Sequence, residues 1–413
     1  MGALEPGIFG LSRSLLVNRN IRAIAITGLV SGVYIGMLNV VLQLFPGTIG
    51  LDVAGLGILM AIGNRFSGVA ATLVQPLAGH YSDVHSRKRI ILLGSATTIL
   101  SMGSFVVAAL TGSLFALFVA FILFGLSQLG SPASQALVAE SVDFDSHSMD
   151  VAYSAIFFLS LVPGVVTPYL AGAIADTYGY LAIFLAAAAL ESFDLYLYWR
   201  AISETKHTAL NAGERGFSLR EAIRLPRASV GYYGALALDA FAFGITTSII
   251  YAMASKNFGF SAADVGLIVA VLNVSTLASQ YPATRLLVSI GARKSIIISE
   301  ALGTALMAGW ALSNTVAEFS ILSVIFGVSV ATWVPGVQSL MMTHAPEGQR
   351  GSIGGKVAAF RGLVAFPAPI IGGFLYQWQG YEAPVLASFI MTIITVVLML
   401  RYLPSRPLTG RAL

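Results

Sequence analysis

The residues Gly79-His80-Tyr81-Ser82-Asp83-Val84-His85-Ser86-Arg87-Lys88-Arg89 form a short charged stretch in a chain that is otherwise almost entirely apolar. A hydrophobic segment at about residues 53–77 precedes it, and another at residues 90–110 follows it. Because each segment is long enough to cross a bilayer, the chain must turn back at the membrane surface between them. The bases at 87–89 suit the lipid headgroups on the cytoplasmic side, and Asp83 suits the amides at a helix end.

The composition is that of a membrane protein. The chain has 413 residues, of which 56% are hydrophobic and 10% charged, and its mean hydropathy is +0.82. A soluble globular chain carries about 25% charged residues. At about 20 residues per span, the apolar segments predict an all-α membrane protein with twelve transmembrane helices. The predicted spans are residues 21–45, 53–82, 88–110, 113–139, 148–174, 178–200, 228–254, 261–288, 294–313, 317–344, 351–376 and 380–403.

The basic residues predict the orientation of these spans. Lys256 falls on one side of the membrane, Arg65 and Arg361 fall inside spans, and the other Lys and Arg residues fall on the opposite side. An excess of bases marks the cytoplasmic side, so we expect a multi-pass protein of the cytoplasmic membrane with both termini in the cytoplasm. The net charge of +4 therefore reflects topology, and we expect a lipid bilayer as partner and no nucleic acid.

The chain divides into two similar halves. Residues 201–227 are the only long polar stretch, and within them residues 216–225 have the pattern of an amphipathic helix lying on the cytoplasmic leaflet. This stretch is predicted to link a bundle of six spans, residues 1–200, to a second bundle of six, residues 228–413. The halves repeat weakly, since Ser131-Pro132-Ala133-Ser134-Gln135 in the fourth span has a counterpart in Val334-Pro335-Gly336-Val337-Gln338 in the tenth.

The charged stretch resembles the loop between helices 2 and 3 of the Major Facilitator Superfamily, whose usual form is G-x-L-a-D-r-x-G-r-k-x-x-l. Five residues match this form: Gly79, Asp83, Arg87, Lys88 and Ile91. Tyr81, Val84 and Ser86 depart from it. The resemblance implies two pseudo-symmetric six-helix bundles and secondary transport by alternating access. It also implies a cytoplasmic gate, for which we expect Gly79, Asp83, Arg87, Lys88 and Glu140. The alternative is a solvated turn that only fixes the topology.

Three charged residues lie deep inside spans: Arg65, Asp239 and Arg361. A charge at the centre of a bilayer costs at least ~2.5–3.5 kcal/mol, so it normally faces a cavity or a partner. The resemblance places their spans beside the central cavity. Two arginines and one acid would leave a positive centre that favours an anionic substrate, since a guanidinium holds a carboxylate or phosphate by two bonds. We expect Asp239 to be the proton-coupling acid. The alternative is a structural pair between Asp239 and one arginine.

Other polar and aromatic residues near the middle of spans are candidates for the substrate site: Tyr34, Asn39, Gln128, Asn273 and Trp333. Each of them would serve equally well in a hydrogen bond or a packing contact between helices. Glu191 and Asp194 in the sixth span and Glu300 in the ninth have no predicted role, because the resemblance places those spans on the outside of the molecule.

The sequence predicts no enzyme, cofactor or metal site. It contains no cysteine, its five histidines lie in loops or at the ends of spans, and no phosphate-binding Gly-x-x-x-x-Gly-Lys-Ser/Thr loop is present. We therefore expect a monomeric carrier, driven by protons or another coupling ion, that moves a small organic and anionic solute. The first alternative is a proton-driven multidrug exporter, favoured by Pro163, Pro168 and Gly172, which partly match a feature of the antiporters, although the fourth span lacks their arginine. The second is a membrane receptor or scaffold that transports nothing.

Overall fold

The structure, a computed structural model, describes residues 18–65, 67–84, 86–141, 156, 158–204, 230–344 and 350–404. Within these residues every regular element is a helix. The predicted amphipathic helix at 216–225 lies outside the described residues, so the proposed division at 201–227 stays a prediction.

Eleven helical segments are long and apolar enough to cross a membrane. Seven spans are uninterrupted helices: α2 (Arg19–Thr48), α5 (Arg87–Thr111), α10 (Tyr180–Ala201), α14 (Ala262–Ile290), α15 (Ala292–Leu312), α16 (Val316–His344) and α19 (Glu382–Tyr402). Four are interrupted: α6 (Leu114–Leu126), η1 (Ser127–Leu129) and α7 (Gly130–Ser141); η2 (Pro163–Val165) and α9 (Thr167–Tyr178); α12 (Val230–Thr247) and α13 (Ile250–Phe258); α17 (Arg350–Ala365) and α18 (Ala368–Gln379).

The second predicted span is present as two shorter helices, α3 (Val53–Gly63) and α4 (Val69–Val84). The break is stabilised by Asn64, whose side-chain oxygen accepts from the backbone N–H of Ser67 at 3.2 Å and whose carbonyl accepts from that of Gly68 at 2.8 Å. These bonds replace the helical hydrogen bonds that are lost, which is what permits a broken helix inside a bilayer. Arg65 lies in this break.

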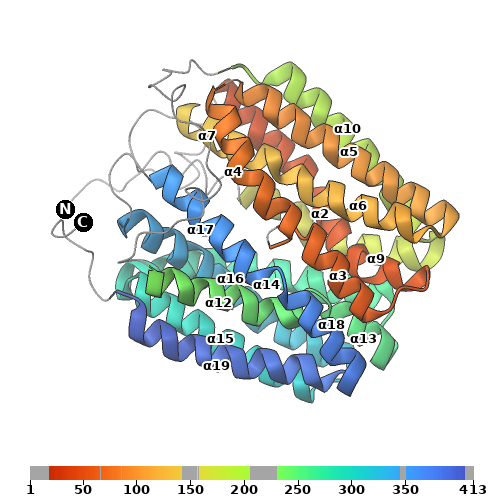
Figure 1. The fold of residues 1–413 in the computed structure, drawn as a ribbon, viewed down its shortest axis with the longest axis vertical. Coiled ribbons are helices and arrows are strands. Elements are labelled where there is room, and N and C mark those ends of the chain that lie inside the picture. The colour runs from red at the N-terminus through yellow and green to blue at the C-terminus, as the bar shows by residue number, and fades with distance from the viewer. Residues whose placement is uncertain are drawn as a thin grey trace.

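The helices form two bundles that lie side by side (Figure 1). The first, coloured red to yellow-green, runs from α2 to α10, and the second, green to blue, runs from α12 to α19. The bundles meet where α3 packs on α18, α9 on α14, and α4 on α17. We call the end of the molecule that carries Ser86, Arg87 and Glu204 the basic end, and the other end, which carries Gly50, Gly112 and Gly380, the opposite end.

The two bundles repeat one local arrangement at the basic end. The Lys88 ammonium, in the first turn of α5, donates to the carbonyls of Trp199 at 2.7 Å and Ile202 at 2.9 Å at the end of α10. Arg293, in the first turn of α15, likewise donates to the carbonyl of Leu400 at the end of α19. A base at a helix C-terminus satisfies free carbonyls and the negative end of the helix dipole. The two bundles are therefore pseudo-symmetric.

Glycines let the bundles approach closely toward the opposite end. A Cβ on Gly57 of α3 would lie 2.2 Å from the carbonyl oxygen of Pro369 in α18. A Cβ on Gly172 of α9 would lie 2.1 Å from the carbonyl oxygen of Ala262 in α14. Both distances are far below a van der Waals contact, so any larger residue would push the bundles apart there.

Candidate functional site

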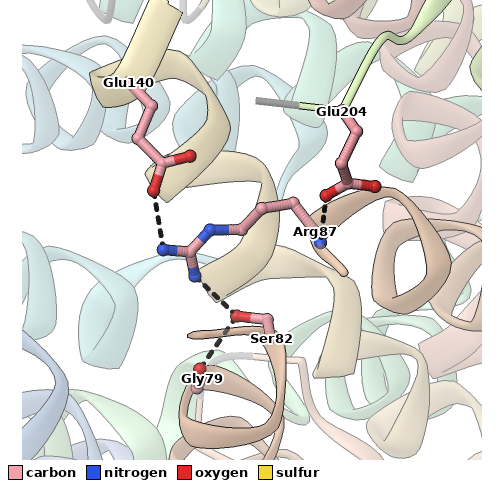
Figure 2. A network of polar contacts seen from close by, with 5 residues as sticks. All are labelled: Gly79, Ser82, Arg87, Glu140 and Glu204. Carbon is pink, nitrogen blue, oxygen red and sulfur yellow. Dashed lines mark hydrogen bonds and ion pairs between the residues drawn. The ribbon is translucent and has the colours of Figure 1, made fainter. Parts of the chain in front are cut away.

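Arg87 organises a polar network at the basic end (Figure 2). Its side chain is largely buried, and it donates from Nη2 to Glu140 Oε1 at 2.8 Å and from Nη1 to Ser82 Oγ at 2.8 Å. Ser82 in turn donates to the carbonyl of Gly79 at 2.8 Å. The network joins the end of α4, the start of α5 and the end of α7. It contains the predicted pair of Arg87 and Glu140.

Glu204 completes this network from the end of the sixth span. Its carboxylate accepts from the backbone N–H of Arg87 at 2.8 Å and from Ser86 Oγ at 2.6 Å (Figure 2). A carboxylate at a helix N-terminus satisfies free amides and the positive end of the dipole. Glu204 was not among the predicted site residues, although an acid placed just after the sixth span is a visible signal.

The two remaining charged residues of the predicted gate are Lys88 and Asp83. Lys88 binds the end of α10 within its own bundle, so in this structure it does not reach the second bundle. The side chain of Asp83 lies outside the described residues, so its part in a gate stays a prediction.

A second cluster lies inside the second bundle and contains Asp239, Glu300, Trp333 and Arg361. Asp239 on α12 is 5% exposed, and its Oδ2 lies 3.5 Å from Arg361 Nη2 on α17. The Arg361 Nε donates to the carbonyl of Leu236 at 3.1 Å, and its Cζ lies 4.6 Å from the ring centroid of Trp333 on α16. The guanidinium is therefore held by an ion pair, a carbonyl and an aromatic face at once.

Glu300 on α15 belongs to this second cluster and had no predicted role. It is 1% exposed, its carboxyl lies beside the Asp239 carboxyl and the Trp333 indole, and neither of its oxygens accepts a hydrogen bond from a donor among the described residues. Two ionised carboxylates have no proton to donate, whereas a protonated one donates to the other. The helix turns this side chain toward α12 and α17, which gives Glu300 neighbours that were not predicted from the sequence.

A third cluster lies inside the first bundle around Arg65. With the Gln128 amide oriented so that its oxygen faces Arg65, that oxygen accepts from Nη2 at 2.9 Å and from Nε at 2.6 Å. The Arg65 Cζ also lies 5.3 Å from the ring centroid of Phe124. Tyr34 on α2 is 3% exposed, and its hydroxyl lies near the Glu191 carboxyl.

Glu191 and Asp194 belong to the third cluster. They are 3% and 1% exposed on α10, and Ser95 of α5 donates from Oγ to Glu191 Oε1. No partners were predicted for them from the sequence. The two acids lie three residues apart on one face of α10, and this face packs against α2 and α5.

Two of the remaining candidates lie where the bundles meet. Asn273 of α14 donates from Nδ2 to the carbonyl of Gly164 at 2.6 Å, which is a structural bond between the bundles. Asn39 of α2 is exposed, and it lies one turn before Gln43, on the same face of the helix. Gln43 donates to the carbonyl of Thr247 and accepts from the backbone N–H of Tyr251, both at 3.0 Å, so this face looks toward the second bundle.

Comparison with known proteins identifies the fold. The sequence model of the Major Facilitator Superfamily matches residues 24–234 and again residues 232–412, so it covers nearly the whole chain in two halves. The chain belongs to the Major Facilitator Superfamily. The superfamily and its solved structures consist of transporters rather than enzymes.

Relatives within the superfamily are distant in sequence. The chain is 23% identical to a multi-drug resistance efflux pump PmrA homolog of Lactococcus lactis over 84% of this chain and 86% of that one. It is 24% identical to the class C tetracycline resistance protein of Escherichia coli over 83% and 92% of the two chains. Among solved structures, a mutant of the nucleoside transporter NupG matches with a TM-score of 0.74 at 12% identity over 93% of this chain and 98% of that one.

The charge balance at the centre of this superfamily member differs from the expectation. Two arginines and one acid predict a positive centre, but the structure places Arg65 near Glu191 and Asp194 in one bundle, and Arg361 near Asp239 and Glu300 in the other. Each intramembrane arginine thus shares its bundle with two buried acids. The sequence missed this because the acids lie on spans that the resemblance places outside.

Proposed function

We propose that this chain is a secondary transporter that exports lipophilic organic solutes in exchange for protons, with the basic end in the cytoplasm. The observation that carries the proposal is the pairing of Asp239 with Glu300 beside Arg361. Such a group of two acids and one base is neutral overall with one proton bound and carries one negative charge without it. It can therefore take up and release a proton while the net charge of the group changes only between neutral and one negative charge. The names of the relatives, which describe drug and tetracycline resistance, support export.

The coupling follows from the contacts of Arg361. With one proton shared between Asp239 and Glu300, a single carboxylate faces the guanidinium. When that proton leaves, two carboxylates compete for Arg361, whose present contact with Asp239 is 3.5 Å long. Arg361 also contacts the ring of Trp333 at 4.6 Å, so any shift of the guanidinium moves its position over the aromatic face. A cationic or aromatic solute on that face would thus bind differently to the two protonation states, which is what coupling requires.

Hydrogen bonds between the bundles hold the opposite end together. Asp176 at the end of α9 accepts from the backbone N–H groups of Ala262 at 3.0 Å and Ala263 at 2.8 Å at the start of α14. Gln377 of α18 donates to Asp52 before α3. We infer that the opposite end is closed here and that it must open in the other half of the cycle.

A second candidate is a carrier of small organic anions. It is favoured by the Arg361 side chain, which is 25% exposed. An anion that replaced the Asp239 carboxylate at this guanidinium would gain a two-bond contact. A receptor or scaffold without transport is the remaining class, and it predicts that no solute crosses the bilayer.

The test is transport in proteoliposomes under an imposed proton gradient, with ethidium as the lipophilic cation and a small aromatic carboxylate as the anion. We expect proton-driven movement of ethidium, its loss in Asp239→Asn, and unchanged movement in Glu382→Gln, which alters an exposed acid at the start of α19. Transport of the carboxylate alone, abolished by Arg361→Ala, would overturn the proposal in favour of the anion carrier. Movement of neither solute would favour the receptor or scaffold.

A further inference from the structure

We propose that Glu191 and Asp194 form a second proton-binding site, inside the first bundle and separate from the pair of Asp239 and Glu300. The inference goes beyond the proposed function, because it requires neither a particular substrate nor a direction of transport. It concerns only how many protons the folded protein holds and where.

The two acids are more deeply enclosed than a surface or lipid-facing position would allow. Asp194 is 1% exposed and Glu191 is 3% exposed, and both point from α10 into the contact with α2 and α5. A buried carboxylate without a matching charge is strongly disfavoured, whereas a neutral carboxylic acid needs only ordinary hydrogen bonds.

The nearby base does not form an ion pair with either acid. The Arg65 guanidinium makes its close contacts with the Gln128 oxygen and the Phe124 ring. The described structure contains no ion pair between Arg65 and Glu191 or Asp194. The charge of Arg65 therefore acts on Glu191 at longer range, and a single positive charge can offset one carboxylate but not two.

Hydrogen bonding separates the roles of the two acids. Glu191 accepts a hydrogen bond from Ser95 and lies near the Tyr34 hydroxyl, so it has a donor of the kind that stabilises an ionised carboxylate. Among the described residues, neither oxygen of Asp194 has a hydrogen-bond partner. Asp194 is thus the member of the pair that binds the proton, and Glu191 the member that stays ionised near Arg65.

The titratable and charged groups around Asp194 come from its own helix and from the elements packed against it. They are Glu191 and Tyr198 on α10, Tyr34 on α2, and Arg65 between α3 and α4. The contact from α5 is Ser95, which does not titrate. Release of the proton would leave two carboxylates beside one base, and water would then have to enter between α10, α2 and α5. Release of the proton from this site therefore loosens the packing of α10 against α2 and α5, and binding of the proton tightens it.

The site is tested by infrared difference spectroscopy of the purified protein, without substrate, between acidic and alkaline pH. The starting protein is the double variant Asp239→Asn, Glu300→Gln, in which the acids of the second bundle are neutral. We expect this variant to keep a band of a buried protonated carboxyl group that disappears at alkaline pH, and we expect the additional change Asp194→Asn to remove that band. The additional change Glu382→Gln is the matched control and should leave the band in place.

Thermal melting separates this role from a purely structural one. Asparagine has nearly the same shape as a neutral aspartic acid, so Asp194→Asn should melt within a few degrees of its parent at acidic pH and lose the pH dependence of melting that the parent has. A double variant without a protonated carboxyl band at any pH would overturn the proposal. So would a band that persists in Asp194→Asn.

Discussion

In the first bundle α5 packs against α10, and in the second bundle the corresponding helices α15 and α19 pack together. The two bundles differ in which helix of this pair carries a buried acid. Counted from the residues that cap the helices, Ser86 and Gly291, Ser95 of α5 and Glu300 of α15 occupy the same position. Counted from Gly179 and Gly380, the glycines that end the preceding helices α9 and α18, Glu191 of α10 and Thr392 of α19 also occupy the same position. In the first bundle the hydroxyl is on the earlier helix and the acid on the later one, and in the second bundle this is reversed.

This reversal shows that the repeat conserves a place for a polar contact while exchanging the residues that fill it. In the first bundle, the hydroxyl of Ser95 donates to Glu191, so one carboxylate has a partner across the pair of helices. In the second bundle, the hydroxyl of Thr392 donates to the carbonyl of Phe389 in its own helix at 2.8 Å. Glu300 is therefore left to Asp239, and among the described residues it is the second bundle that brings two buried carboxyls from different helices together.

The largest effect is expected where the two bundles differ most, at Asp239 and Glu300. Either Asp239→Asn or Glu300→Gln should abolish proton-driven transport, by a factor of about 100 or more, because each removes one member of the shared proton site. Glu191→Gln should retain at least a tenth of the wild-type rate, because the proton of the first bundle is assigned to Asp194. The rates are measured in proteoliposomes at matched protein content. Equal losses in all three variants would remove the distinction between the bundles.

A second comparison concerns the glycines that join the bundles. Gly57→Ala should lower the transport rate about tenfold, because its Cβ would lie 2.2 Å from the Pro369 carbonyl oxygen and would prevent closure of the opposite end. Gly103→Ala is the control, since a Cβ there meets no heavy atom within 4 Å. The chain has no cysteine, so Asn39→Cys provides a single thiol for labelling with a membrane-impermeant maleimide.

The labelling decides the cause of that loss. In a Gly57→Ala background, Asn39→Cys should be labelled more rapidly from the opposite end than in the Gly103→Ala background. Unchanged labelling, or an equal loss of transport in both glycine variants, would contradict the closure described here.

A third comparison is between Arg87 and Glu140, the two partners of the ion pair at the basic end. Arg87→Ala should destabilise the protein by about 1.5–3 kcal/mol, because it leaves Glu140 without its bond to a charged donor. Glu140→Gln should cost less, since its amide still offers an acceptor to Arg87. Both are measured as melting temperatures in detergent. A variant Arg87→Ala that melts with the wild type would show that this network is a solvated turn.

The smallest effect is expected at the two bases that occupy corresponding positions in the two bundles. Lys88→Ala and Arg293→Ala each remove a base from the end of a helix, α10 or α19, and should each cost about 0.3–1 kcal/mol. The two melting shifts should agree within error and diminish as salt concentration rises. A clearly larger loss for only one of them would show that the local repeat is not equivalent in energy.

The sequence was sufficient for the architecture because hydropathy and the positions of bases report the bilayer directly. Runs of apolar residues predicted the spans, and the charged stretch from Gly79 to Arg89 predicted the family, which the comparisons confirm. The break between α3 and α4 was missed, since Asn64 and Gly68 lie within a run that is apolar on both sides. Residue types alone do not show where a helix in lipid is interrupted, because the compensating bonds come from the folded chain.

The partners of the intramembrane charges could be predicted only in part. The pairing of Asp239 with Arg361 was among the alternatives, since both are deep in spans and opposite in charge. Glu300 was missed because a span that is apolar on all sides gives no periodicity from which to read its inward face. The same reason hid Glu191, whose helix is apolar on the face toward lipid and on the face toward α2.

The most direct test of the central claim is proton release on substrate binding. Purified protein in weakly buffered detergent is mixed with ethidium, and a soluble pH indicator measures the protons released while fluorescence measures binding. We expect release from the wild type and none from Asp239→Asn. Binding of ethidium to the wild type without proton release would contradict the proposed coupling, and so would release of as many protons from Asp239→Asn and Glu300→Gln as from the wild type.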